Sequence, residues 1–418
     1  MTARSPSPWF RRIRRLAIAV LLPAALIAVL FIGISPAVEP YPRPTAQDVA
    51  AAREIWSQLK ATKNPGSKPI RIDNTAIRSL SALASDATGM ARFAGRVDGG
   101  VLDGKASISL PLGLWVNAGV SVTGRHSGFP VYRLKVGRVS FPPLIGRWFA
   151  EFGRWVLRLN GADIPPLDAM VRRVSINEHD VLAELALPDK TGVVGGLISA
   201  GGKSLDDPLV SAIYCRIANA QQAAPVRTLP ELIGRAFDNA PANESVEYSR
   251  AALVALSLFV VGERAESLAP KAVILAKACP RPGRAVRLQQ REDLAMHWAF
   301  SAGLTAVLGG EASASLGEWK ELHDSLPDGS GFSFVDLAAD RSGMQIALRA
   351  LDPITAGRTI AELRQATEED LLPQGLLHNP EGLSDASFID RYGGLDRERY
   401  RQAVVSIDRA LAGSRAAR

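Results

Sequence analysis

The sequence predicts a mixed α+β protein, and three stretches of different periodicity support this fold class. Near the N-terminus lies an apolar run long enough to be a transmembrane helix. Between residues 70 and 188 apolar residues mostly alternate, as in antiparallel strands, around one amphipathic helix. From residue 205 onward they recur at helical spacing. We therefore expect a membrane helix, an antiparallel β-rich domain and a mainly α-helical C-terminal domain.

These changes of pattern divide the 418 residues into five segments. Residues 1–37 are expected to be a cytoplasmic N-terminus with a membrane anchor, and 38–69 a stalk with a short helix. Residues 70–192 form the predicted β-rich domain, 193–204 a glycine-rich linker, and 205–418 the helical domain. The linker ends in GKS but lacks the spacing of a phosphate-binding loop, so no nucleotide is expected there.

The net charge of +7 comes largely from arginines near the two ends of the chain. No motif of interleaved aromatic and basic residues accompanies this charge. We therefore expect no nucleic-acid partner.

The apolar run Leu16 to Ile34 contains nineteen uncharged residues. As a helix it would be about 28 Å long, close to the thickness of a bilayer core. The arginines that precede it predict a cytoplasmic N-terminus and an exported body. A cleaved signal peptide is the alternative, with Ser35 and Ala37 as the small residues before the cut. Both alternatives place the body outside the cytoplasm.

The chain has two cysteines, Cys215 and Cys279. Paired CxxC motifs for a metal are absent. In an exported protein the two can form one disulfide. The alternative is a pair of buried, unpaired thiols.

The β-rich region contains one helix with aromatic residues on its apolar face, in the stretch PPLIGRWFAEFGRWVLRLN. We expect this helix to cover one face of the sheet. The arrangement could simply be a core, or it could form a groove for a lipid or another amphiphilic chain, with Trp148, Phe152 and Trp155 as binding residues. The stretch VGRVSFPP and the helix after it resemble exported YpmS-type proteins of bacteria, a resemblance that covers residues 70–188.

The helical region contains a polar segment between Arg291 and Gly343. His297 lies on or beside an apolar helix face. Glu321 and Asp324 share a face of the next helix, and Asp336 and Asp340 share a face of a third. Charged groups on apolar helix faces need a partner, which can be another residue, a metal or a ligand.

Three interpretations of this polar segment remain open. In the first the groups are structural, and Ser333 caps the third helix with Asp336 at its N3 position. In the second they form an acid–base or divalent-metal site. In the third they line a pocket for a ligand or partner. The catalytic candidates are His297, Glu321, Asp324, Asp336 and Asp340; the candidate metal ligands are His297, Glu321 and Asp340; Ser301 and Lys320 are candidate binding residues.

The same segment resembles the YfiM-like family of bacterial envelope proteins and, more distantly, VanZ-like membrane proteins. The matching residues are His297, Ser301, Ala302, Gly317, Lys320, Glu321, Asp324, Gly331, Asp336, Asp340 and Gly343. The resemblance implies a bacterial envelope protein, and together with the N-terminal apolar run we expect a single-pass protein of the inner membrane with its body in the periplasm. The helices are more polar than those of a VanZ-like bundle, which favours a domain that is soluble or lies on the membrane surface.

Two functions follow from these observations. The first is an envelope factor without enzymatic activity that binds a lipid, a glycan or a protein. The alternative is a metal- or carboxylate-dependent hydrolase that acts on an envelope lipid or polymer. Of the remaining helices, Ala251 to Val261 is strongly apolar but too short to cross a membrane, so we expect it to be the central buried helix.

Overall fold

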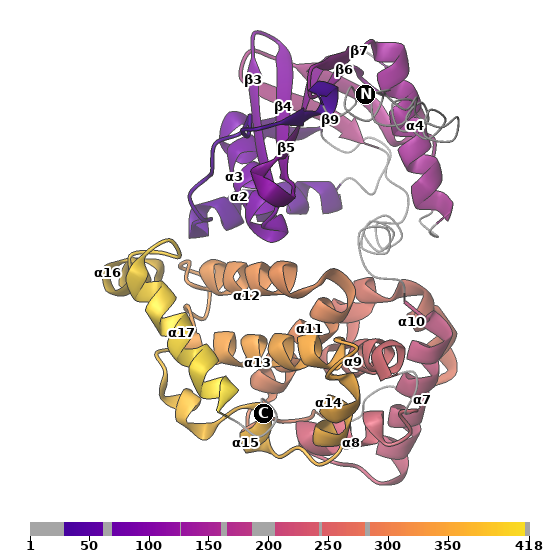
Figure 1. Cartoon of the computed structure of the whole chain (residues 1–418), viewed down its shortest axis with the longest axis vertical. Helices are drawn as coiled ribbons and strands as arrows, with labels where there is room; N and C mark the ends of the chain where they lie inside the picture. The colour runs from indigo at the N-terminus through magenta and orange to yellow at the C-terminus, as the bar shows by residue number, and fades with distance from the viewer. Residues whose placement is uncertain are drawn as a thin grey trace, which may run out of the picture.

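The computed structural model describes residues 29–61, 69–125, 127–159, 165–185, 205–241, 245–280 and 285–413. They form two parts stacked along the long axis of the molecule (Figure 1). One part contains antiparallel sheets with three long helices, and the other is helical. The predicted mixed fold, with antiparallel strands followed by a helical C-terminal region, is confirmed.

The larger sheet is an antiparallel meander in chain order. Its strands are β3 (Ala91–Asp98), β4 (Val101–Ser109), β5 (Trp115–Thr123), β6 (Val131–Val136) and β7 (Val139–Phe141). A short 3₁₀ turn, Pro111–Gly113, separates β4 from β5, at the break that the sequence predicts. Because β6 pairs only with Ala118 to Thr123, the start of β5 is left free to pair with β1 (Ile32–Gly33).

The predicted membrane helix lies mostly outside the described residues. Its last residues differ from the expectation of a helix up to Ile34. Residues 29–31 are helical, but Ile32 and Gly33 form strand β1, which pairs with Val116 and Trp115. The open backbone groups at the start of β5 offer that pairing, which ends the helix early.

The smaller sheet has the order β2 (Ile70–Asp73), β9 (Asp180–Leu185), β8 (Val171–Ile176). A short helix, α5 (Leu167–Met170), leads into β8. The turn between β8 and β9 lies at Asn177 to Asp180, where Asn177 N–H donates to the carbonyl of Asp180.

The sequence missed one helix of this part and predicted another, the short helix within residues 38–69. Helix α3 (Asn74–Thr88) interrupts the stretch predicted as strands, begins at the N-cap Asp73 and packs against β3. Helix α2 (Ala46–Ala61) packs on α3 and on α12 (Gly310–Asp324), so it belongs to the folded body and is not a projecting stalk.

Helix α4 (Pro143–Leu159) forms where the amphipathic pattern predicts it. The expectation that its aromatic face covers the sheet is wrong. The helix packs on β6, and Trp148, Phe152 and Trp155 are 60%, 47% and 52% exposed. Gly146 of α4 lies close to Tyr132 of β6, and the large side chains Trp148, Phe152 and Trp155 are left exposed.

The helical part contains all the described helices after residue 205. The α-helices are α7 (Asp207–Ala223), α8 (Leu229–Phe237), α9 (Ser245–Val261), α10 (Pro270–Leu275), α11 (Glu292–Leu308), α12, α13 (Phe334–Ala350), α14 (Ala356–Leu363), α15 (Glu368–Leu371), α16 (Asp385–Tyr392) and α17 (Glu398–Ala412). The predicted glycine-rich linker at 193–204 lies outside the described residues.

Helix α9 is the centre of the helical core, as the sequence predicts. It packs against α7, α11 and α13, and Leu253, Val254 and Leu256 are fully buried. Together with the 3₁₀ turn that follows, it forms Ser245–Leu268, the one described stretch with the length and hydropathy of a membrane-spanning helix; most of it is buried inside the protein.

The two cysteines are joined in a disulfide. Cys215 on α7 and Cys279, just after a 3₁₀ turn at Ala276–Ala278, have Cα atoms 5.3 Å apart. Of the two alternatives left open by the sequence, the structure contains the disulfide.

The two parts of the molecule meet where α12 packs against α2 and α3. Arg43 connects them, because its guanidinium pairs with Asp86 on α3 at 3.0 Å and with Glu318 on α12. Trp319 on α12 also donates its indole N–H to Asp86 at 3.0 Å. This junction positions α12, which carries part of the candidate site.

Candidate functional site

Helices α11, α12 and α13 bring the polar segment together. α11 carries His297 and Ser301, while α12 carries Glu321 and α13 carries Asp340. α13 approaches α11 closely because residue 343 is glycine. A Cβ atom there would lie 2.2 Å from the backbone oxygen of Trp298, closer than any side chain tolerates. Helix α13 begins with the cap that the sequence predicts, because the Ser333 hydroxyl accepts from the N–H of Asp336 at 3.0 Å.

His297 is buried between two carboxylates of α13. Its Nδ1 lies 3.1 Å from Asp340 Oδ1, and its Nε2 lies 3.4 Å from Asp336 Oδ2. The two aspartates are four residues apart, so they occupy neighbouring turns of one helix face. Burial alone would lower the pKa of His297, but the negative charge of Asp340 outweighs it and raises that pKa to about 9.

Asp340 has one satisfied and one unsatisfied oxygen. Oδ1 accepts from the Ser301 hydroxyl at 2.7 Å and from His297. Oδ2 is buried and has no hydrogen-bond partner among the described residues. A carboxylate oxygen that is buried without a partner costs free energy, so native proteins rarely keep one unless something binds there. Gly317 on α12 faces this oxygen, and a Cβ atom at residue 317 would lie 3.0 Å from it.

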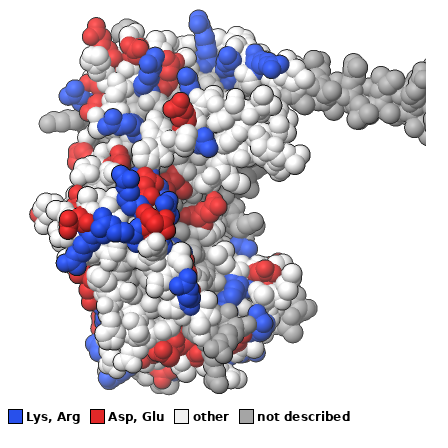
Figure 2. Space-filling view, turned by 60° about the vertical axis from the view of Figure 1, so that its left-hand side comes forward, with Lys and Arg blue, Asp and Glu red and all other residues white. Residues whose placement is uncertain are grey.

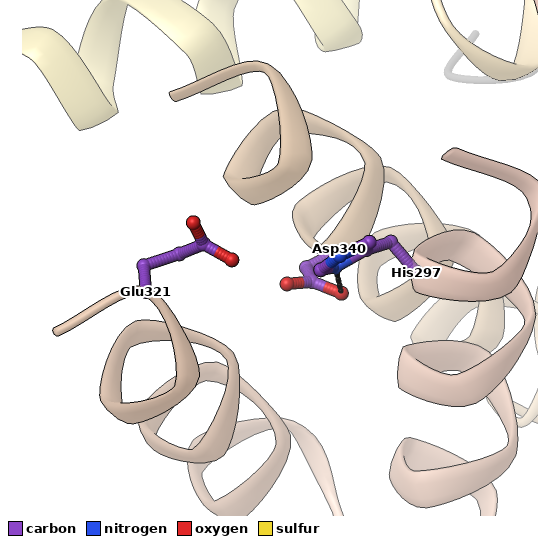
Figure 3. Close-up of side chains that lie close together, drawn as sticks. All are labelled: His297, Glu321 and Asp340. Atoms are coloured by element: carbon purple, nitrogen blue, oxygen red, sulfur yellow. Dashed lines mark hydrogen bonds and ion pairs between the residues drawn. The ribbon is translucent and has the colours of Figure 1, made fainter. Parts of the chain in front are cut away.

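Glu321, on α12, is fully buried. Its Oε1 accepts from Lys320 Nζ at 2.9 Å, and its Oε2 accepts from the backbone N–H of Ser333 at 2.9 Å. Figure 3 shows the Glu321 carboxylate turned toward that of Asp340. Burial raises the pKa of Glu321 to about 7. Glu321 thus joins α12 to the beginning of α13.

His297, Glu321 and Asp340 can act together as metal ligands. One ligand atom from each lies within 4.8 Å of the other two. An imidazole with two carboxylates is a donor set that suits a divalent first-row metal ion. The hydrogen bonds from Ser301 to Asp340 and from Lys320 to Glu321 orient the ligands, as outer-shell partners do in metalloproteins.

Other charges near this cluster are already paired. Lys320 Nζ lies 2.8 Å from Asp324 and 3.8 Å from Asp336. Burial alone would raise the pKa of Asp324, but the bond from Lys320 outweighs it and lowers that pKa. Arg291 lies 3.4 Å from Asp336 and 2.9 Å from Glu381. The outer carboxylates are therefore balanced by cations, whereas Asp340 keeps an unpaired oxygen.

A cavity of about 940 Å³ lies against the cluster, at the junction of the two parts. The polar lining residues include His297, Ser301, Lys320, Asp324, Asp336 and Asp340. The apolar lining residues are Val261, Met296, Phe300, Leu304 and Leu316. Arg53 of α2 adds a residue from the β-containing part. Figure 2 shows acidic and basic residues gathered at mid-height on the molecule, where the two parts meet.

The structure brings most of the predicted site residues together but not all. The seven polar candidates on α11, α12 and α13 lie close together, and all of them except the fully buried Glu321 line the cavity. Trp148, Phe152 and Trp155 lie on α4, in the other part of the molecule. Sequence reasoning missed Arg291, Glu381 and Arg53 as cavity residues, because only the folded chain brings them to it.

No family model, curated protein or solved structure matches this chain. The resemblances to YfiM-like, VanZ-like and YpmS-type proteins remain predictions.

Proposed function

We propose that this protein is a membrane-anchored hydrolase of the bacterial cell envelope that uses a divalent metal ion held by His297, Glu321 and Asp340. The observation that carries the proposal is the convergence of these three ligands beside the 940 Å³ cavity, where Asp340 Oδ2 is buried without a partner. A cation between Asp340 and Glu321 would satisfy that oxygen.

The ligand set favours a catalytic metal over a structural one. Structural zinc sites are closed by four protein ligands, whereas catalytic sites have three and leave a position for water or substrate. Here three ligands come from three helices, and His297 and Asp340 face the cavity. A bound metal supplies Lewis acidity and an activated water for hydrolysis. Lys320 and Ser301 would orient the ligands.

The cavity suits an amphiphilic substrate. Its apolar lining residues can contact a lipid chain, while its carboxylates and cations can bind a head group or sugar. An envelope lipid or a lipid-linked polymer has this chemistry. An anchor that begins at Leu16 and ends before strand β1, a periplasmic body and the YfiM-like resemblance belong to the same proposal, because they would put the cavity on the side of the membrane where such molecules lie.

Binding without catalysis is the second candidate. Both oxygens of Glu321 already accept hydrogen bonds, and His297 already lies between two carboxylates. Most of the cluster is thus satisfied without a metal. An envelope factor that binds a lipid, a glycan or a protein in the same cavity would need no metal ion.

Metal analysis of the full chain, purified in detergent and equilibrated with Zn²⁺ or Mn²⁺, tests the metal site. We expect about one ion per chain, from the single three-ligand cluster. The ion should be lost in His297→Ala and Asp340→Asn. His323→Ala should retain it, because His323 lies on α12 outside the cluster. No bound ion in the wild type, or equal binding in all four proteins, would contradict the metal site.

A second assay separates hydrolysis from binding. The full chain is incubated with lipids extracted from bacterial envelopes, and the release of fatty acid, phosphate or sugar is measured. Release that requires both the metal and His297 supports the hydrolase. A retained ion with no release of product supports the binding factor.

A further inference from the structure

Helix α4 has the reverse of the arrangement expected for a surface helix. Gly146 is buried against Tyr132 of β6, whose hydroxyl donates to the Gly146 carbonyl; a Cβ atom at residue 146 would lie 3.0 Å from the Tyr132 ring. The outer face carries Leu144, Trp148 and other large apolar residues. A helix of a water-soluble domain normally buries its large apolar residues and exposes small or polar ones.

The exposed residues form one continuous stripe. Leu144, Trp148, Phe152 and Trp155 follow one another at helical spacing and are 82%, 60%, 47% and 52% exposed. The rings of Trp148 and Phe152 stack with centroids 5.5 Å apart, and those of Phe152 and Trp155 at 5.6 Å. An exposed apolar patch of this kind marks a contact with a membrane or a partner.

The surroundings of this stripe are basic. The chain contains no aspartate or glutamate between Asp103 and Glu151, but six lysines and arginines. Helix α4 itself carries Arg147, Arg154 and Arg158 against a single acid, Glu151, and Arg158 is exposed. Tryptophan beside arginine and lysine is typical of helices that lie at the surface of an anionic bilayer.

The end of the apolar N-terminal run lies at the same edge of the sheet. The Leu30 carbonyl accepts from the N–H of Arg138 at 2.8 Å, in the turn between β6 and β7. Strand β1 continues this contact by pairing with β5. β7 then leads directly into α4, and Figure 1 shows α4 beside β6 and β7. The segment proposed as the membrane anchor therefore ends close to the strands that carry α4.

We propose that α4 lies in the surface of an anionic phospholipid membrane, with its aromatic stripe among the acyl chains and the arginines of α4 at the headgroups. The inference rests on the proposed anchor in one respect only: the anchor identifies the membrane on which α4 lies. Two contacts, the anchor and α4, would hold the β-containing part in one orientation on the bilayer.

Tryptophan quenching by brominated lipids tests this contact. The full chain is reconstituted into vesicles of phosphatidylcholine and phosphatidylglycerol, and quenching is compared between the wild type and the double variant Trp148→Phe/Trp155→Phe. We expect the double variant to lose a large share of the quenchable fluorescence, since its two membrane reporters are gone. The matched control, Trp56→Phe on α2, should change only the unquenched emission.

Three results would overturn the proposal. The first is equal quenching in the wild type and the double variant. The second is a wild-type chain that does not float with the vesicles, which would also remove the proposed anchor. The third is a dimer, seen by light scattering, that Trp148→Ser/Phe152→Ser/Trp155→Ser disrupts, since a second copy would then cover α4. Flotation without quenching of Trp148 and Trp155 overturns α4 alone and leaves the anchor intact.

Discussion

Gly343 determines whether the candidate site can form. Its position opposite the Trp298 carbonyl leaves no room for a side chain, so α11 and α13 can approach each other only with glycine there. That approach places Asp340 within hydrogen-bond distance of both His297 and Ser301. Gly343 thus determines how close Asp340 lies to His297 and Ser301.

We expect Gly343→Ala to lower the free energy of unfolding by about 2–4 kcal/mol, because the obstructing atom is backbone and the helices must separate. Denaturant unfolding of the full chain measures this. The control is Gly357→Ala on α14, where the nearest atom to a new Cβ is Ser245 Oγ at 4.0 Å. This change should stabilise the helix by up to about 1 kcal/mol. Equal effects at the two positions would contradict the close-approach argument.

At the scale of elements, the disulfide constrains the first helix of the helical part. Cys215 and Cys279 are separated by 64 positions in the chain, and their bond ties α7 to the segment beyond α10. The unfolded chain therefore contains a long closed loop, which lowers its conformational entropy.

Replacing both cysteines, as Cys215→Ser/Cys279→Ser, should lower the free energy of unfolding by about 2–4 kcal/mol. Chemical denaturation with and without reducing agent measures the loss. Reducing agent should destabilise the wild type and have no effect on the double variant. If the wild type is equally stable in both conditions, the disulfide does not contribute in this way.

The sequence predicted elements that contain many large apolar residues and missed a helix that buries mainly small ones. Ala251 to Val261 is apolar on every side and forms the buried centre, as expected. The stretch Asn74–Thr88 buries Ala76, Ser79, Ala82 and Leu83 at helical spacing, but most of these side chains are small and the face is only weakly apolar. The pattern of α4 identified which residues share a face but not whether that face meets the sheet or the outside.

The candidate site was predictable in part for a related reason. Helical spacing grouped Glu321 with Asp324 and Asp336 with Asp340, but it carried no information on distances between helices. The unpaired oxygen of Asp340 depends on how α12 and α13 pack, through Gly317. Such a feature is set by tertiary contacts alone.

For the whole molecule, Arg43 is the main charged connection between the two parts. Its guanidinium pairs with Asp86 and with Glu318, and Glu318 also accepts from the Tyr400 hydroxyl at 2.8 Å. Removing Arg43 would leave the buried Glu318 carboxylate without its cation.

We expect Arg43→Ala to destabilise the junction by about 1–3 kcal/mol and to speed hydrogen exchange in α3 and α12. Exchange mass spectrometry of the full chain provides the measurement. Arg71→Ala is the control, because the Arg71 side chain is 69% exposed in its pair with Asp180 and should contribute less than about 1 kcal/mol. Unchanged exchange in α12 of Arg43→Ala would show that apolar packing alone holds the parts together.

Both parts of the molecule line the cavity. Arg53 comes from the β-containing part, and the other lining residues come from the helical part, beyond residue 260. A fragment that begins in the 193–204 segment would keep the acidic cluster and lose Arg53, a cation of the cavity lining. Such a fragment would not be an adequate substitute for the intact protein in ligand screening. Any movement between the two parts would also change the shape of the cavity. An N-terminal membrane anchor, which is attached to the β-containing part, would therefore influence which molecules enter the cavity beside His297 and Asp340.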